Sequence, residues 1–219
     1  MTSGPNEPPR AAADGEAAPR ISLVDAVDVV RTTRRDDDVV ITSMGVAREW
    51  MTRSQHALDL VHVPSAMGHA TSVGLGLAIA RPDVRVIVCH GDGSMLMNLG
   101  SLVSITAAGP ANLTVILFDN RVYEVTGAQP TPGSPPARAD GGSVDFAAMA
   151  HACGFLSVHR FSELTAWRRS MPALLDAPGP RFVVLDIAPV PGALGPRSPG
   201  PGHERARRFM EALESVRVP

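Results

Sequence analysis

A short glycine-containing segment, residues 90–94 (His-Gly-Asp-Gly-Ser), is the part of the sequence best suited to chemistry. It follows an apolar run that ends at Cys89, and an apolar stretch with helical spacing follows it. Open α/β sheets bind ligands where strands end and helices begin. Gly91 and Gly93 allow a tight turn and a close approach of the backbone to a phosphate, and Asp92 offers a hard carboxylate. Taken alone, such a turn more often only connects a strand to a helix.

A second polar segment lies at an informative distance from the first. Residues 94–118, 25 in number, separate Gly93 from the pair Asp119-Asn120. One helix and one strand fit into this interval, so both turns would reach the same edge of a sheet. The arrangement resembles the thiamine diphosphate (ThDP) signature, in which GDG is followed by about two dozen residues and a pair that is usually Asn-Asn. Two unrelated turns are the alternative.

The resemblance implies a Mg²⁺ site at these two turns. Its ligands would be Asp92, the Asn120 side chain and the Val122 backbone carbonyl, completed by diphosphate oxygens and a water. In this chain Asp119 replaces the first Asn of the pair, whereas Asn120, at the liganding position, is intact.

Met67 lies 25 positions before Asp92. In ThDP enzymes, a bulky apolar residue at this distance wedges beneath the cofactor and forces the bent V shape that brings the 4′-amino group toward C2. The resemblance further implies that the Ser65 carbonyl accepts from the 4′-amine and that the Met67 N–H donates to the pyrimidine. The alternative is that Met67 is an ordinary core methionine.

Residues 42–49 form a third expected strand-to-helix turn. Its N–H groups and hydroxyls suit further contacts with the diphosphate, and an ordinary N-cap region is the alternative. The candidate cofactor-binding residues are Thr42, Ser43, Gly45, Val46, Ser65, Met67, Gly91, Asp92, Gly93, Ser94, Asn120, Val122 and Tyr123. The candidate metal ligands among them are Asp92, Asn120 and Val122.

Longer strings narrow the resemblance, which covers most of residues 21–190. It is carried by TSMGVAREW, SAMGHATSVGLGLAIARPD, GDGSMLMNLGSL, DNRVYEVTGAQPT and DFAAMAHACGF. These strings are similar to ThDP-dependent 2-oxo acid decarboxylases, in particular sulfopyruvate decarboxylase β subunits and phosphonopyruvate decarboxylases. The family usually reads closer to YESTGGQPT after the metal site, where this chain has Val125 and Ala128, and Ala66 stands where Ser is common. Because that loop would face the reaction centre, a substrate that differs from those of the usual family members is an open alternative.

The elements that must position these residues alternate between strands and helices. Apolar runs at 39–42, 84–89, 113–118 and 182–187 predict strands, and those that are nearly continuous fit strands covered on both faces. Helices are predicted at 23–31, 68–80, 94–107, 145–152 and 162–175. The alternation predicts a doubly wound α/β fold with a mostly parallel sheet, helices on both faces and right-handed crossovers.

The two ends of the chain differ from this domain. Residues 1–20 are rich in Pro, Ala, Gly and Glu and predict a disordered leader. Residues 21–190 would form the diphosphate-binding domain, and 191–219 a Pro/Gly-rich linker and a last helix. That helix is expected to turn one apolar face inward, formed by Phe209, Met210, Leu213 and Val216.

Composition excludes several classes of protein. Cys89 and Cys153 are far apart and form no CxxC pair, which argues against a disulfide scaffold, a zinc site or an iron–sulfur cluster. The net charge is −2, and no basic block indicates nucleic-acid binding. No apolar run is long enough to cross a membrane, and the N-terminus lacks the layout of a secretory signal, so we expect a cytosolic protein.

The resemblance implies a ThDP- and Mg²⁺-dependent decarboxylase component that acts on a small anionic 2-oxo acid such as sulfopyruvate or phosphonopyruvate. ThDP enzymes activate the cofactor through a glutamate on a pyrimidine-binding domain, and residues 21–190 leave no room for that domain. We therefore expect an alpha-type, pyrimidine-domain partner subunit, with two copies of each chain (alpha2beta2). The alternatives are an acetolactate-synthase-like carboligase component and a catalytically silent ThDP-binding partner.

Several residues near the motifs have two interpretations each. His69 and His90 could relay protons or be structural histidines. Arg121 could attract an anionic substrate or be a solvated charge. Glu124 could line the active site or order its loop, and residues 128–143 could form a lid or a mobile loop without a role.

Overall fold

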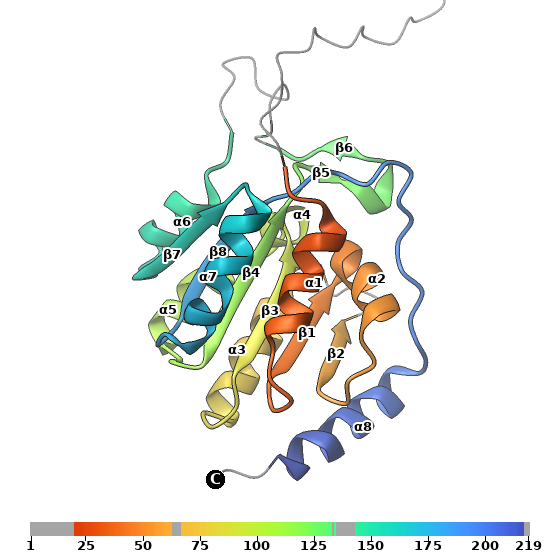
Figure 1. Cartoon of the computed structure of the whole chain (residues 1–219), viewed down its shortest axis with the longest axis vertical. Coiled ribbons are helices and arrows are strands. Elements are labelled where there is room, and N and C mark those ends of the chain that lie inside the picture. Colours follow the sequence, from red (N-terminus) through yellow and green to blue (C-terminus); the bar gives the residue numbers. More distant parts are fainter. Residues whose placement is uncertain (1–19, 63–66, 133, 135–142, 217–219) are drawn as a thin grey trace, which may run out of the picture.

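A parallel sheet forms the centre of the computed structural model, which describes residues 20–62, 67–132, 134 and 143–216. Within these residues, six strands pair in the order β2-β1-β3-β4-β8-β7 (Figure 1). They are β1 (Val39–Ser43), β2 (Asp59–His62), β3 (Val86–Gly91), β4 (Leu113–Asp119), β7 (Ser157–Phe161) and β8 (Arg181–Asp186). Every neighbouring pair in this sheet is parallel. The predicted doubly wound α/β fold is thereby confirmed.

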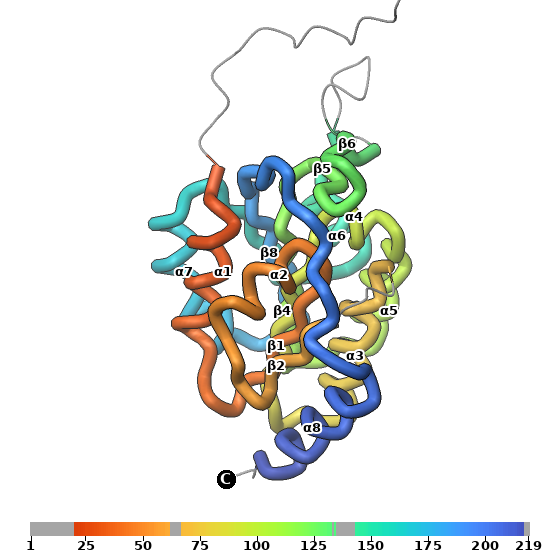
Figure 2. The backbone as a smooth tube through the Cα atoms, turned by 90° about the vertical axis from the view of Figure 1, so that its right-hand side faces the viewer, coloured from red at the N-terminus to blue at the C-terminus, as the bar shows by residue number. Residues whose placement is uncertain are grey.

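Helices cover both faces of the sheet, as the edge-on view in Figure 2 shows. One face is covered by α1 (Leu23–Thr33), α2 (Met44–Arg53) and α7 (Leu164–Asp176). The other is covered by α3 (Ala70–Ala80), α5 (Gly100–Ala108), α6 (Phe146–Ala152) and α8 (Gly202–Ser215). Successive residues of β1 serve opposite faces: Val40 belongs to the first core, and Val39 and Ile41 belong to the second. Because both faces are covered, the central strands are apolar throughout.

The prediction of one continuous helix over residues 94–107 is wrong. The chain instead forms α4 (Asp92–Leu96) and α5, with a break at residues 97–99. Asn98 causes the break through tertiary bonds: its amide nitrogen donates to the Gly68 carbonyl at 3.2 Å and to Ser72 Oγ at 3.2 Å. The Asn98 carbonyl also accepts from the Ser101 hydroxyl at 2.8 Å. These contacts override an apolar periodicity that runs on across the break.

The sequence prediction missed the edge strands β2 and β7. Both carry polar residues, such as Asp59 in β2 and Arg160 in β7, and so lack the continuous apolar run of the central strands. It also missed a small antiparallel pair, β5 (Val122–Tyr123) and β6 (Gln129–Pro130), with the 3-10 helix η1 (Glu124–Thr126) between them. The predicted strand 84–89 corresponds to β3, which begins and ends two residues later.

Residues 190–201 run without helix or strand from the carboxyl end of the sheet, past the β2 edge, to α8 (Figure 2). Phe209 and Leu213 of α8 are buried in the second core. The Arg81 guanidinium donates to the Leu213 carbonyl at 2.6 Å and helps to hold the helix in place. Met210 is 58% exposed, so its predicted place on the packed face was wrong. The predicted leader lies almost wholly outside the described residues.

Among the helices of the described chain, none is long and apolar enough to cross a membrane.

Candidate functional site

A pocket of about 110 Å³ lies at the carboxyl end of the sheet. The chain leaves β1 towards β2 on one side and later leaves β3 towards β4 on the other, so the winding direction switches between β1 and β3. Open α/β sheets bind ligands at this switch point. The pocket is lined by residues 44–46 after β1, 91–94 at the end of β3, 122–126 after β4, and by Leu23, Met97, Phe118, Asn120 and Ile187.

Most of the predicted cofactor-binding residues meet in this pocket. They are Gly45, Val46, Gly91, Asp92, Gly93, Ser94, Asn120, Val122 and Tyr123. Thr42 and Ser43 are buried and are absent from its lining. Ser43 Oγ lies 2.9 Å from His90 Nδ1, whereas Thr42 Oγ1 has no hydrogen-bond partner within the described structure. Ser65 lies outside the described residues.

Met67 is 66% exposed and does not line the pocket, which excludes the core-methionine interpretation. Its loop is fixed by Gly68, which has a φ of +91°. A Cβ at this glycine would lie 2.6 Å from the Ser94 carbonyl oxygen and 2.7 Å from Asn98 Cβ, so no larger residue fits. The loop is therefore seated on the end of α4, next to Ser94 in the pocket wall. The predicted wedge role of Met67 stays a prediction.

The two glycines of the GDG turn have different surroundings and therefore different roles. A Cβ at Gly91 would meet nothing within 4 Å, so this position leaves open space beside the pocket for a ligand to approach the backbone. A Cβ at Gly93 would lie 2.6 Å from Tyr123 Cδ1 and Cε1. The second glycine is thus required because the Tyr123 ring packs directly over it.

Asp92 is a buried carboxylate whose environment disfavours its charge. Burial first, and then the charge of Asp119, raise its pKa to about 8. Burial also raises the pKa of Asp119. The Arg121 backbone N–H donates to Asp92 Oδ2 at 2.9 Å, which fixes the carboxylate in the pocket wall. A bound cation would reverse this situation, because it stabilises the ionised form.

The oxygen atoms around Asp92 fit a hard divalent cation. Asn120 Oδ1 accepts from the Val122 N–H at 3.0 Å, which orients the amide within the same pocket. Carboxylate, amide and carbonyl oxygens together with phosphate form the ligand chemistry of Mg²⁺. No group of three or more His, Cys, Asp or Glu side chains that could hold a metal occurs in the described part of the chain. A site made from protein oxygens and a ligand's phosphates is consistent with that finding.

Backbone strain gathers at this end of the sheet. Non-glycine residues with positive φ are uncommon, and they cluster at functional sites where the surroundings hold them in place. Among the described residues they are Met44 (φ 46°), Met67 (39°), Arg121 (65°) and Ala128 (60°). All four belong to the turns and loops that carry the predicted site.

The structure bears on the two interpretations that the sequence left for several residues near the motifs. Glu124 is buried and lines the pocket. Arg121 instead lines a separate small cavity, with Nη2 3.9 Å from Asp186 Oδ1, so its side chain does not face the candidate site. His90 is buried beside Ser43, and His69 is exposed at the start of α3. These positions favour a structural role for His90.

Sequence reasoning missed the apolar part of the pocket. Its walls include Leu23, Met97, Phe118 and Ile187. Phe118 immediately precedes the Asp119-Asn120 pair, which could have indicated its position. Leu23 and Ile187 come from distant parts of the chain, and no local pattern distinguishes them from core residues.

Fold and site together define a ThDP-binding domain of the diphosphate-binding type. The family described as "Thiamine pyrophosphate enzyme, C-terminal TPP binding domain" matches residues 38–186, and the chain belongs to this family. Thiamine pyrophosphate is another name for ThDP, so the cofactor expected from the motifs is confirmed.

Two relatives and one solved structure show what the chain resembles. Phosphonopyruvate decarboxylase of Streptomyces hygroscopicus is 39% identical over 176 residues, which are 79% of this chain and 41% of the relative. Sulfopyruvate decarboxylase subunit beta of Methanothermobacter thermautotrophicus is 36% identical over 154 residues, 70% of this chain and 76% of the relative. The resemblance inferred from the motifs is confirmed. The chain spans less than half the length of the first relative.

The fold is shared with ThDP-dependent 4-hydroxybenzoylformate decarboxylase of Rhodococcus jostii, with a TM-score of 0.63 and 20% identity. The match covers 84% of this chain and 36% of that one.

Proposed function

We propose that the chain is the diphosphate-binding component of a ThDP- and Mg²⁺-dependent decarboxylase for a small anionic 2-oxo acid. The observation that carries the proposal is the meeting of Asp92, Asn120 and Val122 in one pocket at the switch point of the sheet. Sulfopyruvate and phosphonopyruvate are the candidate substrates, because the relatives at 36–39% identity are named for them. A cytosolic location belongs to the same proposal.

Bound ThDP would supply a nucleophilic carbon for the keto group and an electron sink for the release of CO₂. The chain's own residues would bind and orient. Asp92 and the Asn120 amide oxygen would hold the metal, with the Val122 carbonyl as the third protein ligand. The open space at Gly91 would admit the diphosphate. The apolar residues Leu23, Phe118 and Ile187 would keep water from the pocket.

A second surface supports a partner subunit. Helices α3 and α5 contain no charged residue, yet Ile79 of α3 and Val103 of α5 are exposed. Met97, which is exposed between α4 and α5, also lines the pocket, so this apolar surface reaches the pocket. Exposed apolar side chains on helices without a charged residue mark an interaction site. We infer that a pyrimidine-domain chain covers this α3–α5 surface and brings the activating glutamate, in an alpha2beta2 assembly.

The departure at Val125 bears on the substrate. Val125 lines the pocket, so this departure from the usual family pattern lies in the wall of the proposed cofactor site. Carboligation of the acetolactate-synthase kind, by enzymes that share this domain, is the second candidate activity. Assays that measure both the aldehyde released after decarboxylation and any carbon–carbon coupling product would separate the two.

The test of the partner begins with the chain purified alone and assayed with ThDP, Mg²⁺, pyruvate, sulfopyruvate and phosphonopyruvate. We expect no turnover until the pyrimidine-domain subunit is added. Val103→Arg should prevent co-purification of the two chains because a charge would enter the interface. Met210→Arg is the matched control, since Met210 is 58% exposed on α8 and Val103 is 56% exposed. Robust decarboxylation by a preparation that contains only this polypeptide would contradict the two-chain proposal.

A further inference from the structure

Glu124 is a buried carboxylate in the pocket wall that the proposed metal site does not use. It begins η1, two residues after Val122, and its side chain is only 4% exposed. The cofactor pocket includes it among its lining residues. Burial of a charged carboxylate is unfavourable unless hydrogen bonds or an opposite charge compensate for the lost water.

The partners of Glu124 come from two other parts of the chain. Its Oε1 accepts from the Val190 backbone N–H at 2.7 Å, just beyond β8. Its Oε2 lies 3.6 Å from Arg48 Nη2, on the first turns of α2. A Cβ at Gly45 would lie 3.3 Å from the same Oε2, so the turn after β1 also contacts this carboxylate. One side chain thus joins η1, the start of α2 and the segment just beyond β8.

Residues 190–195, which we name the strap, are held to the same place by further contacts. Arg48 Nη1 donates to the Leu194 carbonyl at 3.3 Å. A Cβ at Gly195 would lie 2.9 Å from Val125 Cγ1, so the strap packs closely on η1. The strap and η1 are therefore packed together, and the Glu124–Arg48 pair links both to α2.

The segment that carries Val122 needs such a restraint. Its regular structure is one pair of two-residue strands, β5 and β6, and short isolated strand pairs are marginally stable. Arg121 and Ala128, at its two ends, hold positive φ values of 65° and 60°. Strained residues persist only where the surrounding structure over-determines them.

We propose that Glu124 is a positioning residue. It locks residues 122–126 and the strap against the start of α2, and it thereby fixes the Val122 carbonyl and the Tyr123 ring where the cofactor binds. The inference rests on the proposed function, because the fixed wall serves the metal and the diphosphate. A purely structural role would instead lower stability without a specific effect on the pocket.

The first measurement needs no cofactor. Hydrogen exchange on the full chain should show about tenfold faster exchange in the strap and in residues 121–130 for Glu124→Ala. Glu124→Gln should show a smaller change, because its amide oxygen can still accept from the Val190 N–H while the charge toward Arg48 is lost. This second variant also serves if Glu124→Ala does not fold.

The second measurement is the affinity of the enzyme, reconstituted with its partner, for ThDP in the presence of Mg²⁺. Calorimetry should show affinity weakened about tenfold or more for Glu124→Ala, as for other residues that orient metal ligands. Arg48→Met leaves the buried Glu124 carboxylate without its cation, and Glu124→Gln removes that charge, so the double variant should lose less ThDP affinity than the sum of the two single losses. In Glu124→Gln alone, Arg48 keeps Glu49 as a partner at 3.1 Å.

The matched control is Asp59→Asn. Asp59 is a buried acid on β2 paired with Arg34, and both side chains are 6% exposed. This variant should lower the melting temperature while strap exchange and ThDP affinity remain at wild-type values. If it weakened ThDP binding as much as Glu124→Ala at an equal loss of stability, the positioning role would be refuted.

The remaining outcomes are also decisive. Wild-type exchange in both Glu124 variants would overturn the inference, and so would faster exchange with unchanged ThDP affinity. Failure of the wild-type enzyme to bind ThDP would overturn the proposed function and the inference together. The exchange data would still report whether Glu124 holds the strap and residues 122–126 in place.

Discussion

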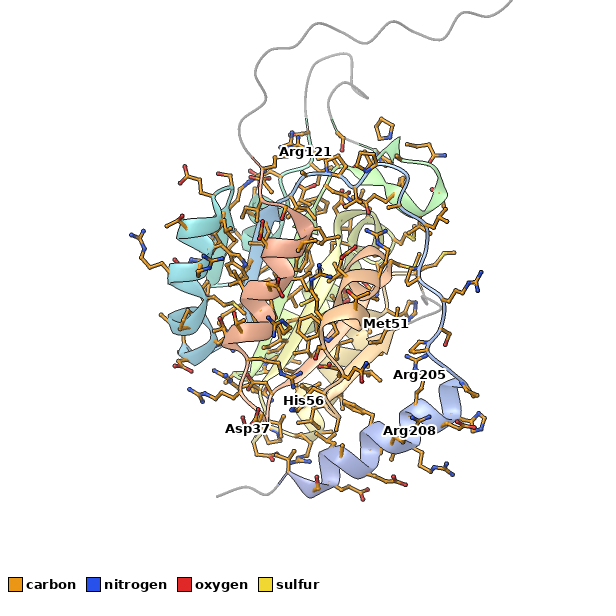
Figure 3. The ribbon with its side chains drawn as sticks, turned by 45° about the vertical axis from the view of Figure 1, so that its right-hand side comes forward. Asp37, Met51, His56, Arg121, Arg205 and Arg208 are labelled. Carbon is orange, nitrogen blue, oxygen red and sulfur yellow. The ribbon has the colours of Figure 1, made fainter. Side chains whose placement is uncertain are left out.

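The two ends of the sheet differ in how their buried aspartates are held. At the amino end, buried acids are paired with arginines: Asp38 accepts from Arg85 Nε at 2.7 Å and Nη2 at 2.6 Å, and Asp59 accepts from Arg34. At the carboxyl end, Asp92 and Asp119 lie together, and burial raises the pKa of both. Figure 3 labels Asp37 and His56 at the first end and Arg121 at the second.

This difference indicates that the amino end of the sheet contributes to stability and the carboxyl end to ligand binding. Paired charges at the amino end satisfy each other within the chain, and buried Arg181 there donates to the Leu174 and Leu175 carbonyls at 2.9 and 3.0 Å. The carboxyl end instead combines disfavoured carboxylates with strained backbone, which is typical of a site prepared for a ligand. Substitutions at the carboxyl end should therefore weaken ThDP binding with little loss of stability, and substitutions at the amino end should lower stability with little loss of ThDP binding.

The largest effect is expected for Asp92→Ala. Asp92 is the proposed charged metal ligand, and its removal should weaken Mg²⁺-dependent ThDP binding at least about 100-fold. The melting temperature should not fall, because the lost carboxylate is one whose charge the fold disfavours. Calorimetry on the reconstituted enzyme and thermal unfolding measure the two quantities. Undiminished ThDP binding would refute the metal assignment.

Asp38→Ala should give the opposite profile. It leaves Arg85 without its buried partner and removes an acceptor for the Arg35 N–H at 2.8 Å. Breaking a buried ion pair from one side costs about 3 kcal/mol of unfolding free energy. Urea unfolding should show this loss, whereas ThDP affinity of the folded enzyme should stay at the wild-type value. A matching loss of affinity would show that the two ends are not independent.

Met67→Ala tests a residue at the carboxyl end that belongs to neither core. Because Met67 is exposed, the variant should retain its melting temperature. If the side chain orients the cofactor, kcat should fall roughly tenfold with a smaller change in ThDP affinity. Steady-state kinetics with the partner subunit present provide the measurement. Normal turnover would remove Met67 from the site.

The smallest effect concerns pH. Burial raises the pKa of Asp92 from 3.8 to about 8, so the folded chain holds this proton more tightly than the unfolded chain. Asp92 therefore stabilises the cofactor-free fold below about pH 4, and this contribution is lost as the pH rises to about 8. We expect Asp92→Asn to melt above wild type near pH 8, with a difference that shrinks toward pH 4. A pH-independent difference would show that Asp92 is already ionised in the folded chain.

Local patterns in the sequence determined the central strands and the residues of the GDG and Asp-Asn turns that meet in the pocket. The apolar runs that became β1, β3, β4 and β8 are recognisable because strands covered on both faces need apolar residues at every position. The interval between Gly93 and Asn120 is equally local, since one helix and one strand fill it. Asp92 and Asn120 could therefore be assigned to one pocket before any contact between them was known.

Contacts between distant residues were decided only by the tertiary structure. Asn98 ends α4 because it bonds to Gly68 and Ser72, and neither partner is visible in the periodicity of residues 94–107. Burial, and then the charge of Asp119, raise the pKa of Asp92 because the ends of β3 and β4 converge. Glu124 accepts from an N–H that is 66 positions further along the chain. A hydrogen bond or a buried charge depends on separation in space, and sequence spacing predicts that separation only within one strand–helix unit.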